Sequence, residues 1–586
     1  MRDDSTPTTD PLTPAALRQR IEAARGLHPV DLVLRGGTLV NVLSGELHRT
    51  DVAVHGGRVV GLGEGYEGRE EVDCRGKWIA PGFIDGHMHV ESTMLTLPEF
   101  ARAALPHGTV AAILDPHEIA NVHGIDGIRY ILESREGLPL SAFIMASSCV
   151  PATHMETAGA ALSADDLSPL FGEAGVIGLA EVMNFPGVVH ADGGVLDKLA
   201  VAHAEDAVID GHAPGLRGRD LSAYIAAGVG SDHESTQLEE AREKLRKGMR
   251  VVIREASPAK NLAALLPLVT PQNARRCSFV TDDRHPADLL REGHVDNAVR
   301  KAIGLGLDPV LAYQMASINT AEWFRLDEKG FGAVAPGFRA DLLVLDDLKA
   351  VSIERVYVKG RLVAQAGEAI VELPGAPSTL PGSVHLDWEA FPGFAIPAEG
   401  ERVRVIEIVP AQIVTERGEG HPLIENGLAE ADPSTDLLKM AVVERHGKGS
   451  GVGLGFVRGI GLKAGAIASS VAHDSHNVVI AGTSDADMRR ALEAIVEMQG
   501  GQVVVEGGDV KATLALPIAG LMSDRPIEEV RDAVEKLHEA YHALGGELND
   551  PFMQLAFLAL PVIPALKLTD KGLVDVEAFE IVDLWL

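Results

Sequence analysis

The sequence predicts a (β/α)₈ barrel that is inserted into a small β-sandwich domain and followed by a C-terminal α+β domain. Two observations predict this fold class. Between residues 80 and 335, apolar strand-like runs alternate with helical patterns eight times, over roughly the 250 residues that such a barrel needs. Strand-like runs with glycine-pair turns flank that segment at 31–79 and 336–375, as expected of one small domain that the barrel interrupts.

The barrel strands follow the apolar runs along the chain. They are expected at 78–84, 110–114, 141–146, 176–180, 207–210, 229–231, 250–254 and 277–281. A doubly wound open sheet is the competing fold, but eight evenly spaced units favour closure. Outside the barrel, 1–30 is expected to be a polar tail with one short helix near 14–25. Residues 376–586 are expected to form a separate α+β domain with an amphipathic helix at 526–544.

The charge balance argues against two classes of partner. The 586 residues include 52 Lys+Arg and 84 Asp+Glu, a formal net charge of −32. Such a chain repels phosphate backbones and anionic lipid, so neither nucleic acid nor a membrane surface is expected as a partner. The N-terminal segment has no apolar core, so no signal peptide is expected. The best apolar run, 555–566, is short and broken by Pro561 and Pro564, so no membrane span is expected. The widely spaced Cys74, Cys149 and Cys277 are typical of reduced thiols, so a cytoplasmic location is expected.

Polar side chains with metal-ligand chemistry follow most of the predicted barrel strands. Catalytic groups of such barrels lie at the carboxyl ends of the strands. His87 and His89, two residues apart after the first strand, point to the same side and can reach one ion. The other predicted strand ends carry Asp115, His117 and Glu118, then Glu181, His212, His233 with Glu234, and Asp282. The sequence therefore predicts a metal site at this end of the barrel.

Six of these side chains form the predicted ligand set: His87, His89, Glu181, His212, His233 and Asp282. Four imidazoles and two carboxylates are too many for one tetrahedral ion that keeps a water position open. They suit two divalent ions about 3.5–4 Å apart, bridged by a carboxylate and a hydroxide. Imidazole and carboxylate accept Mn²⁺, Fe²⁺ or Zn²⁺, so the ligand types alone do not select the metal.

Longer segments resemble the amidohydrolase superfamily and, within it, the adenine deaminase family. The resemblance covers the chain from about residue 30. It is carried by PGFIDGHMHVEST at 81–93, DPHEIANVHG at 115–124, GLAEVMNFPGV at 178–188, DGHAPGL at 210–216, SDHEST at 231–236, TDD at 281–283, PGFRADLLVLD at 336–346 and SVAHDSHN at 470–477.

The resemblance implies hydrolytic deamination of a purine base, adenine, to hypoxanthine and ammonia at a two-metal centre that often contains manganese. It also implies a homodimer or larger homo-oligomer. His87 and His89 would bind the first ion and His212 and His233 the second. Glu181 would bridge the two ions, and Asp282 would complete the first site and accept a proton from the attacking hydroxide.

Several roles stay open at the level of sequence. Attack at purine C6 needs a proton donor near N1. Glu234 is the first candidate and Glu118 the second, although either could instead orient a histidine. Asp115 and His117 are expected to support a ligand, contact substrate or bind an extra ion. His473, Asp474 and His476 lie in a polar run that indicates a solvated loop by default, whereas the resemblance favours a loop over the barrel mouth.

Three alternative functions compete with adenine deamination. A modified adenine such as N6-methyladenine differs by one methyl group, which a pocket discriminates by only about 1–3 kcal/mol. A cyclic-amide hydrolase of the same superfamily usually needs a lysine where this chain has Glu181. A non-catalytic relative should lack one or more ligands, but every expected ligand type is present.

Overall fold

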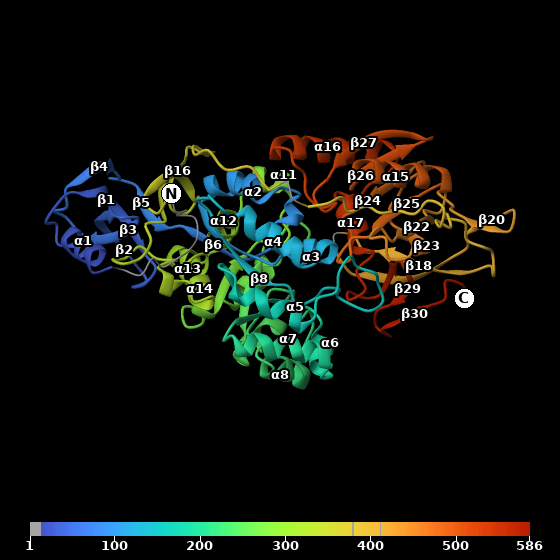
Figure 1. Ribbon diagram of the computed structural model, residues 1–586, viewed down its shortest axis with the longest axis horizontal. Helices are drawn as coiled ribbons and strands as arrows, with labels where there is room; N and C mark the ends of the chain where they lie inside the picture. The colour runs from blue at the N-terminus through green and yellow to red at the C-terminus, as the bar shows by residue number, and fades with distance from the viewer. Residues whose placement is uncertain (1–12, 378–379, 411) are drawn as a thin grey trace.

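The computed structural model describes residues 13–377, 380–410 and 412–586. The chain forms three parts in a row along its longest axis, with the barrel in the middle (Figure 1). The helix predicted in the N-terminal tail is present as α1 (Pro14–Ala24), where the Thr13 side chain caps the first turn by accepting from the amide of Ala16. The rest of the predicted tail, residues 1–12, lies outside the described residues.

Strands from both sides of the barrel segment form one nine-stranded sheet. β14 pairs antiparallel with β5, so the chain returns from the barrel to the sheet that it left. The core of this sheet is aliphatic. Its strands are β1 (Val30–Asn41), β2 (Glu46–His55), β3 (Arg58–Leu62), β4 (Gly68–Asp73), β5 (Trp78–Pro81), β14 (Leu342–Asp347), β15 (Ser352–Val358), β16 (Arg361–Gln365) and β17 (Glu368–Ala369).

Eight parallel strands form the barrel, which confirms the predicted fold class. Two ladders, β10-β9-β8-β7-β6 and β11-β12-β13, meet at two seams. Gly230 N–H donates to the Ile209 carbonyl at one seam, and Asp282 N–H donates to the His87 carbonyl at the other. The strands are β6 (Phe83–Met88), β7 (Thr109–Leu114), β8 (Ser141–Ala146), β9 (Val176–Val182), β10 (Val208–Gly211), β11 (Ser231–Asp232), β12 (Arg250–Arg254) and β13 (Cys277–Val280).

The first predicted barrel strand, 78–84, is wrong as a single element. Trp78–Pro81 belongs to the N-terminal sheet and Phe83–Met88 to the barrel. The chain changes sheets at Gly82, where a Cβ atom would lie 2.4 Å from Cγ2 of Val110. Only glycine fits this close approach of β6 to β7, and an apolar run alone does not reveal such a corner.

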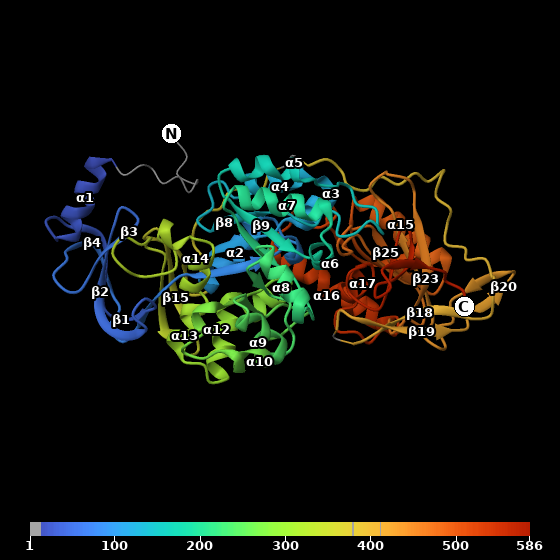
Figure 2. The same ribbon diagram turned by 90° about the horizontal axis from the view of Figure 1, so that it is seen from below.

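Helices surround the barrel and link its strands (Figure 2). Among the described residues, none is long and apolar enough to span a membrane. These helices are α2 (Leu97–Ala104), α3 (His117–His123), α4 (Ile125–Ser134), α5 (Ala164–Leu167), α6 (Phe185–Val189), α7 (Gly193–Ala204), α8 (Gly218–Ala226), α9 (Leu238–Arg246), α10 (Leu262–Leu265), α11 (Pro286–Arg291), α12 (Val295–Gly304), α13 (Pro309–Met315) and α14 (Ile318–Trp323).

The C-terminal part is built on an eight-stranded sheet in the order β19-β18-β23-β22-β25-β24-β26-β27, with small sheets β20-β21 and β28-β29-β30 beside it. α16 matches the predicted helix at 526–544. The elements are β18 (Val403–Ile408), β19 (Thr415–Gly420), β20 (Leu423–Glu425), β21 (Leu428–Glu430), β22 (Leu438–Val443), β23 (Val452–Arg458), β24 (Ala466–Ser469), β25 (Val478–Gly482), α15 (Asp485–Met498), β26 (Gly501–Glu506), β27 (Asp509–Ala515), α16 (Ile527–Ala543), α17 (Pro551–Phe557), β28 (Leu566–Thr569), β29 (Gly572–Asp575) and β30 (Glu580–Val582).

Candidate metal centre

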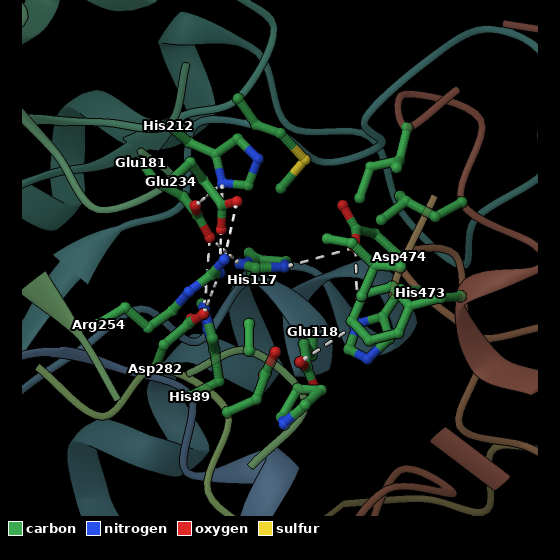
Figure 3. A pocket seen from close by; sticks show the side chains of 18 residues that line it. His89, His117, Glu118, Glu181, His212, Glu234, Arg254, Asp282, His473 and Asp474 are labelled. Carbon is green, nitrogen blue, oxygen red and sulfur yellow. Dashed lines mark hydrogen bonds and ion pairs between the residues drawn. The ribbon is translucent and has the colours of Figure 1, made fainter. Parts of the chain in front are cut away.

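The six predicted metal ligands lie together at the carboxyl ends of the barrel strands. Overlapping groups of them have ligand atoms within 4.8 Å of one another. His89, Glu181, His212 and Asp282 also line a pocket that faces the C-terminal part (Figure 3). The strand register brings them together, because parallel strands of a closed barrel all end at the same rim.

Glu181, near the end of β9, lies between two pairs of imidazoles. Its Oε1 lies 3.4 Å from Nε2 of His89 and 3.8 Å from Nε2 of His87. Its Oε2 lies 2.6 Å from Nδ1 of His212 and 3.2 Å from Nε2 of His233. Burial raises the pKa of this carboxyl, but the imidazoles, His212 foremost, outweigh burial and hold the pKa well below its usual range. Glu181 is therefore an anion with one oxygen facing each pair.

The orientation of His87 and His89 fits a metal ion. Nδ1–H of His87 donates to Oδ2 of Asp210, and Nδ1–H of His89 donates to the carbonyl of Asp115, both over 3.0 Å. These bonds leave the Nε2 lone pairs directed toward Glu181 and Asp282. Nε2 of His87 is buried and has no hydrogen-bond partner among the described residues. An unsatisfied lone pair in such a donor set fits a divalent cation.

Asp282 lies two residues beyond β13 and completes a group of possible ligands with His87 and His89. Its Oδ1 lies 3.2 Å from Nε2 of His89 and 3.6 Å from Nε2 of His87. Its backbone is left-handed, with φ 55°, a conformation that aspartate tolerates better than most residues. Burial raises the pKa of Asp282, but Arg254, His89 and His233 together outweigh burial and hold the pKa well below the usual range.

Arg254, the last residue of β12, pairs with two carboxylates of the site. Its Nη1 lies 2.7 Å from Oδ2 of Asp282 and also contacts Oε1 of Glu234, while its Nη2 donates to Oε2 of Glu234 over 3.1 Å. The guanidinium of Arg254 therefore occupies both carboxylate oxygens of Glu234. The sequence analysis missed Arg254. The available signal was an arginine at the carboxyl end of a buried strand, RVVIR.

Glu118, in the first turn of α3, has the opposite environment. It is buried, and burial followed by the charge of Glu91 raises its pKa well above the usual range. Ser92 Oγ lies 3.1 Å from Oε1 of Glu118 and 2.5 Å from Oδ1 of Asp283. The Ser92 hydroxyl is the only donor to either carboxyl in these two contacts, and Oε2 of Glu118 has no hydrogen-bond partner among the described residues. The surroundings of Glu118 therefore provide little compensation for a buried negative charge.

Asp115 and His117 lie beside Glu181. Nδ1 of His117 lies 3.1 Å from Oδ2 of Asp115 and 3.5 Å from Oε1 of Glu181, and its Nε2 lies 3.8 Å from Oδ1 of Asp474. Burial lowers the pKa of His117, but Asp115 and Asp474 together outweigh burial and raise the pKa well above its usual value. His89, Asp115, His117 and Glu181 are also close enough to hold an ion, so the structure fits two of the three predicted roles of this pair, support of a ligand and binding of an extra ion.

The polar run between β24 and β25 is buried, so its default interpretation as a solvated loop is wrong. All five residues from His473 to Asn477 are buried. His473 and Asp474 enter the pocket from the C-terminal part, opposite the barrel ligands (Figure 3). The His473 ring stacks on Phe557 with centroids 4.6 Å apart. The loop therefore covers the barrel mouth, as the resemblance favoured.

His476 lies behind the pocket lining. Its Nδ1 accepts a hydrogen bond from the amide of Ala472 over 3.2 Å, so in the neutral ring Nε2 carries the proton. Nε2 lies 4.0 Å from Oε2 of Glu118. Glu118, His473 and His476 are close enough to hold a cation, but a protonated Nε2 cannot bind one. The two imidazoles therefore lie near Glu118 without a hydrogen bond to it.

Comparisons with known proteins agree with this geometry. The amidohydrolase family model matches residues 78–363, and the model of the adenine deaminase C-terminal domain matches residues 412–580. A protein named adenine deaminase from Desulfatibacillum aliphaticivorans is 50% identical over 97% of this chain and 99% of its own length. The chain belongs to the adenine deaminase family. A second relative of that name, from Cereibacter sphaeroides (strain ATCC 17025 / ATH 2.4.3), is 49% identical over 97% of this chain and 99% of its own length.

Among solved structures, an adenosine deaminase from Xanthomonas campestris with bound Zn matches with a TM-score of 0.44 and 15% identity. The match covers 58% of this chain and 95% of the adenosine deaminase chain.

Membership of the adenine deaminase family disfavours the alternative functions. β9 offers Glu181 and no lysine, which argues against the cyclic-amide hydrolases that need one. The structure also brings all six predicted metal ligands together, which argues against a non-catalytic relative.

Proposed function

We propose that this protein deaminates adenine to hypoxanthine and ammonia by hydrolysis. The observation that carries the proposal is the position of Glu181, between two imidazole pairs and beside Asp282, in a pocket that is lined on its other side by apolar residues. Water adds at C6 and the 6-amino group leaves as ammonia, which balances all atoms without an oxidant or reductant. The relatives named adenine deaminase, similar over nearly their whole length, support this choice of substrate.

The ligand set supports a site for two divalent ions, with Mn²⁺ expected and Fe²⁺ or Zn²⁺ as alternatives. His87, His89 and Asp282 would hold one ion, His212 and His233 the other, and Glu181 would lie between them. When bound, divalent ions at such a site lower the pKa of water toward neutrality and stabilise negative charge on oxygen.

The proton movements belong to the residues of the chain. Asp282, which Arg254 and the imidazoles hold in its ionised form, accepts a proton from the attacking water. Glu118 donates a proton to the purine ring, since its environment raises its pKa, whereas both oxygens of Glu234 are already in contact with Arg254. This reverses the order in which the two glutamates were expected.

The purine lies between the carboxylates of the barrel and the loop that follows β24. Asp115, His117, His473 and Asp474 contact the ring or orient the groups that do, and His476 lies near Glu118. The apolar side of the pocket includes Met183, Ile413, Phe557, Leu560 and Ile563. A flat aromatic base suits this pairing of an apolar wall with a few placed polar groups.

The proposal also includes the location and the oligomeric state of the protein. The three cysteines are free and buried, which supports the reducing cytoplasm as the location. A homodimer or larger homo-oligomer is expected from the family resemblance.

Metal-dependent ammonia release tests the proposal. The protein would be stripped, reloaded with Mn²⁺, and assayed on adenine, N6-methyladenine, adenosine, guanine and cytosine. About two ions per chain and turnover on adenine are expected. Two ions without turnover on any purine would refute the substrate assignment, and turnover restricted to N6-methyladenine would replace it.

A further inference from the structure

Lys567, in β28, has an unusual environment for a lysine. The residue is fully buried. Its ammonium donates to the carbonyl of Phe557 over 2.8 Å and to the carbonyl of Ile413 over 2.9 Å. Burial is the single influence on its pKa, which falls to about 7, and among the described residues no carboxylate pairs with it. Buried lysines are normally paired, because desolvating an ammonium is costly.

The two carbonyl partners belong to separate segments that both line the catalytic pocket. Ile413 lies in the connection between β18 and β19, and Phe557 is the last residue of α17. A cation at the carboxyl end of a helix is electrostatically favourable. The Phe557 ring stacks on His473, whose Nδ1 lies 3.5 Å from Oε1 of Glu118. One buried ammonium therefore ties together two pocket segments, and one of these supports the loop over the barrel mouth.

Ile413 and Phe557 also line a second cavity. The outer cavity lies between the barrel and the C-terminal part, with Asp436, Lys463 and Asp550 among its lining residues. Pro258, Ile413 and Phe557 line both this cavity and the catalytic pocket. We call these three residues, which line both spaces, the partition.

We propose that Lys567 is a positioning residue of the active site, which fixes Ile413 and Phe557 in the partition and so sets how tightly the purine is held. A lysine reaches both carbonyls from a single buried position, whereas an apolar residue would leave both without their donor. The inference rests on the proposed function in one respect, namely that the pocket binds the purine.

The test compares Lys567→Met with Lys571→Met in the metal-loaded full chain. Methionine has a similar length but no donor. Lys571 is the matched control, because its Nζ also donates to a carbonyl, that of His154 over 2.8 Å, but on the exposed surface. We expect KM for adenine to rise about tenfold in Lys567→Met, with kcat within about threefold and two metal ions retained. Lys571→Met should match the wild type.

An unchanged KM in a folded Lys567→Met protein would overturn the inference, as would a fall in kcat that follows metal loss. If that variant does not fold, Lys567→Gln carries the test. Its amide ends short of the Nζ position and cannot reach both carbonyls without moving one segment, so KM should again rise and an unchanged KM would overturn the inference. Absence of adenine turnover in the wild type and in Lys571→Met would instead refute the proposed function.

Discussion

At the scale of single residues, two glutamates in one pocket have opposite electrostatic environments. Arg254 contacts both oxygens of Glu234, whereas Glu118 lies near Ser92, Glu91 and His473, whose own pKa burial lowers. The pKa of a carboxyl depends on its nearest charges and its burial. The two side chains therefore suit different roles, and an acid is expected only where the proton is retained near neutral pH.

Substitution of each glutamate by glutamine separates these roles. Glu118→Gln removes the ionisable proton, so kcat should fall by about 10²–10⁴ while the metal content stays at the wild-type value. Glu234→Gln should lower kcat less than Glu118→Gln does. It removes a carboxylate that contacts Arg254, whereas the proton donor stays in place. Steady-state kinetics with metal analysis on the same preparations measures both. A larger loss of kcat in Glu234→Gln would return the acid role to Glu234.

At the scale of elements, the barrel depends on the corner between β5 and β6. The chain leaves the N-terminal sheet after Pro81 and enters the barrel at Phe83. Gly82 contacts the side chain of Val110 on β7 so closely that no Cβ fits without movement. This corner sets the start of β6, the strand that carries His87 and leads to His89.

Gly82→Ala should therefore destabilise the protein. Overpacking of this kind costs about 1–3 kcal/mol, which would lower the melting temperature by several degrees. Gly172→Ala is the matched control, since nothing lies within 4 Å of its Cβ position and its backbone is not left-handed. Thermal unfolding followed by circular dichroism compares the two variants. Equal melting temperatures would show that Val110 moves aside without cost.

At the scale of the whole molecule, the catalytic pocket is shared between two parts of the chain. The barrel supplies the metal ligands, and the loop between β24 and β25 supplies His473 and Asp474 (Figure 3). Asn477 joins these parts, because its Nδ2 donates to the carbonyl of Thr157 over 2.9 Å and lies 3.4 Å from Oδ1 of Asp570. The loop thus depends on contacts that no single part contains.

Asn477→Asp should weaken this attachment. The new carboxylate would face the Thr157 carbonyl and the Asp570 carboxylate. Two hydrogen bonds from the amide would thus be replaced by repulsion between oxygen atoms. We expect kcat/KM for adenine to fall about tenfold with the metal content unchanged. Asn426→Asp makes the same change in the exposed turn between β20 and β21 and should be silent. Wild-type kcat/KM in Asn477→Asp would show that the loop is held by other contacts.

Much of the site follows from local patterns that the sequence displays. His87 and His89 stand two residues apart after an apolar run, and Glu181, His212, His233 and Asp282 each stand at or just beyond the end of one. The roles of Arg254, Asp210 and Ser92 could not be predicted in this way, although the first two also stand at strand ends. Each acts through a partner far away in the chain, and the sequence gives no distance between residues that are remote along it.

The sequence by itself determined the alternation that closes the barrel, the ligand types at its rim and the family to which the chain belongs. These depend on periodicity and on residue chemistry, which are local properties. Only the tertiary structure decided that burial raises the pKa of Glu118, that the loop from His473 to Asn477 is buried, and that Lys567 joins two pocket segments. Burial and the nearest charges decide these properties, and both depend on how distant segments pack.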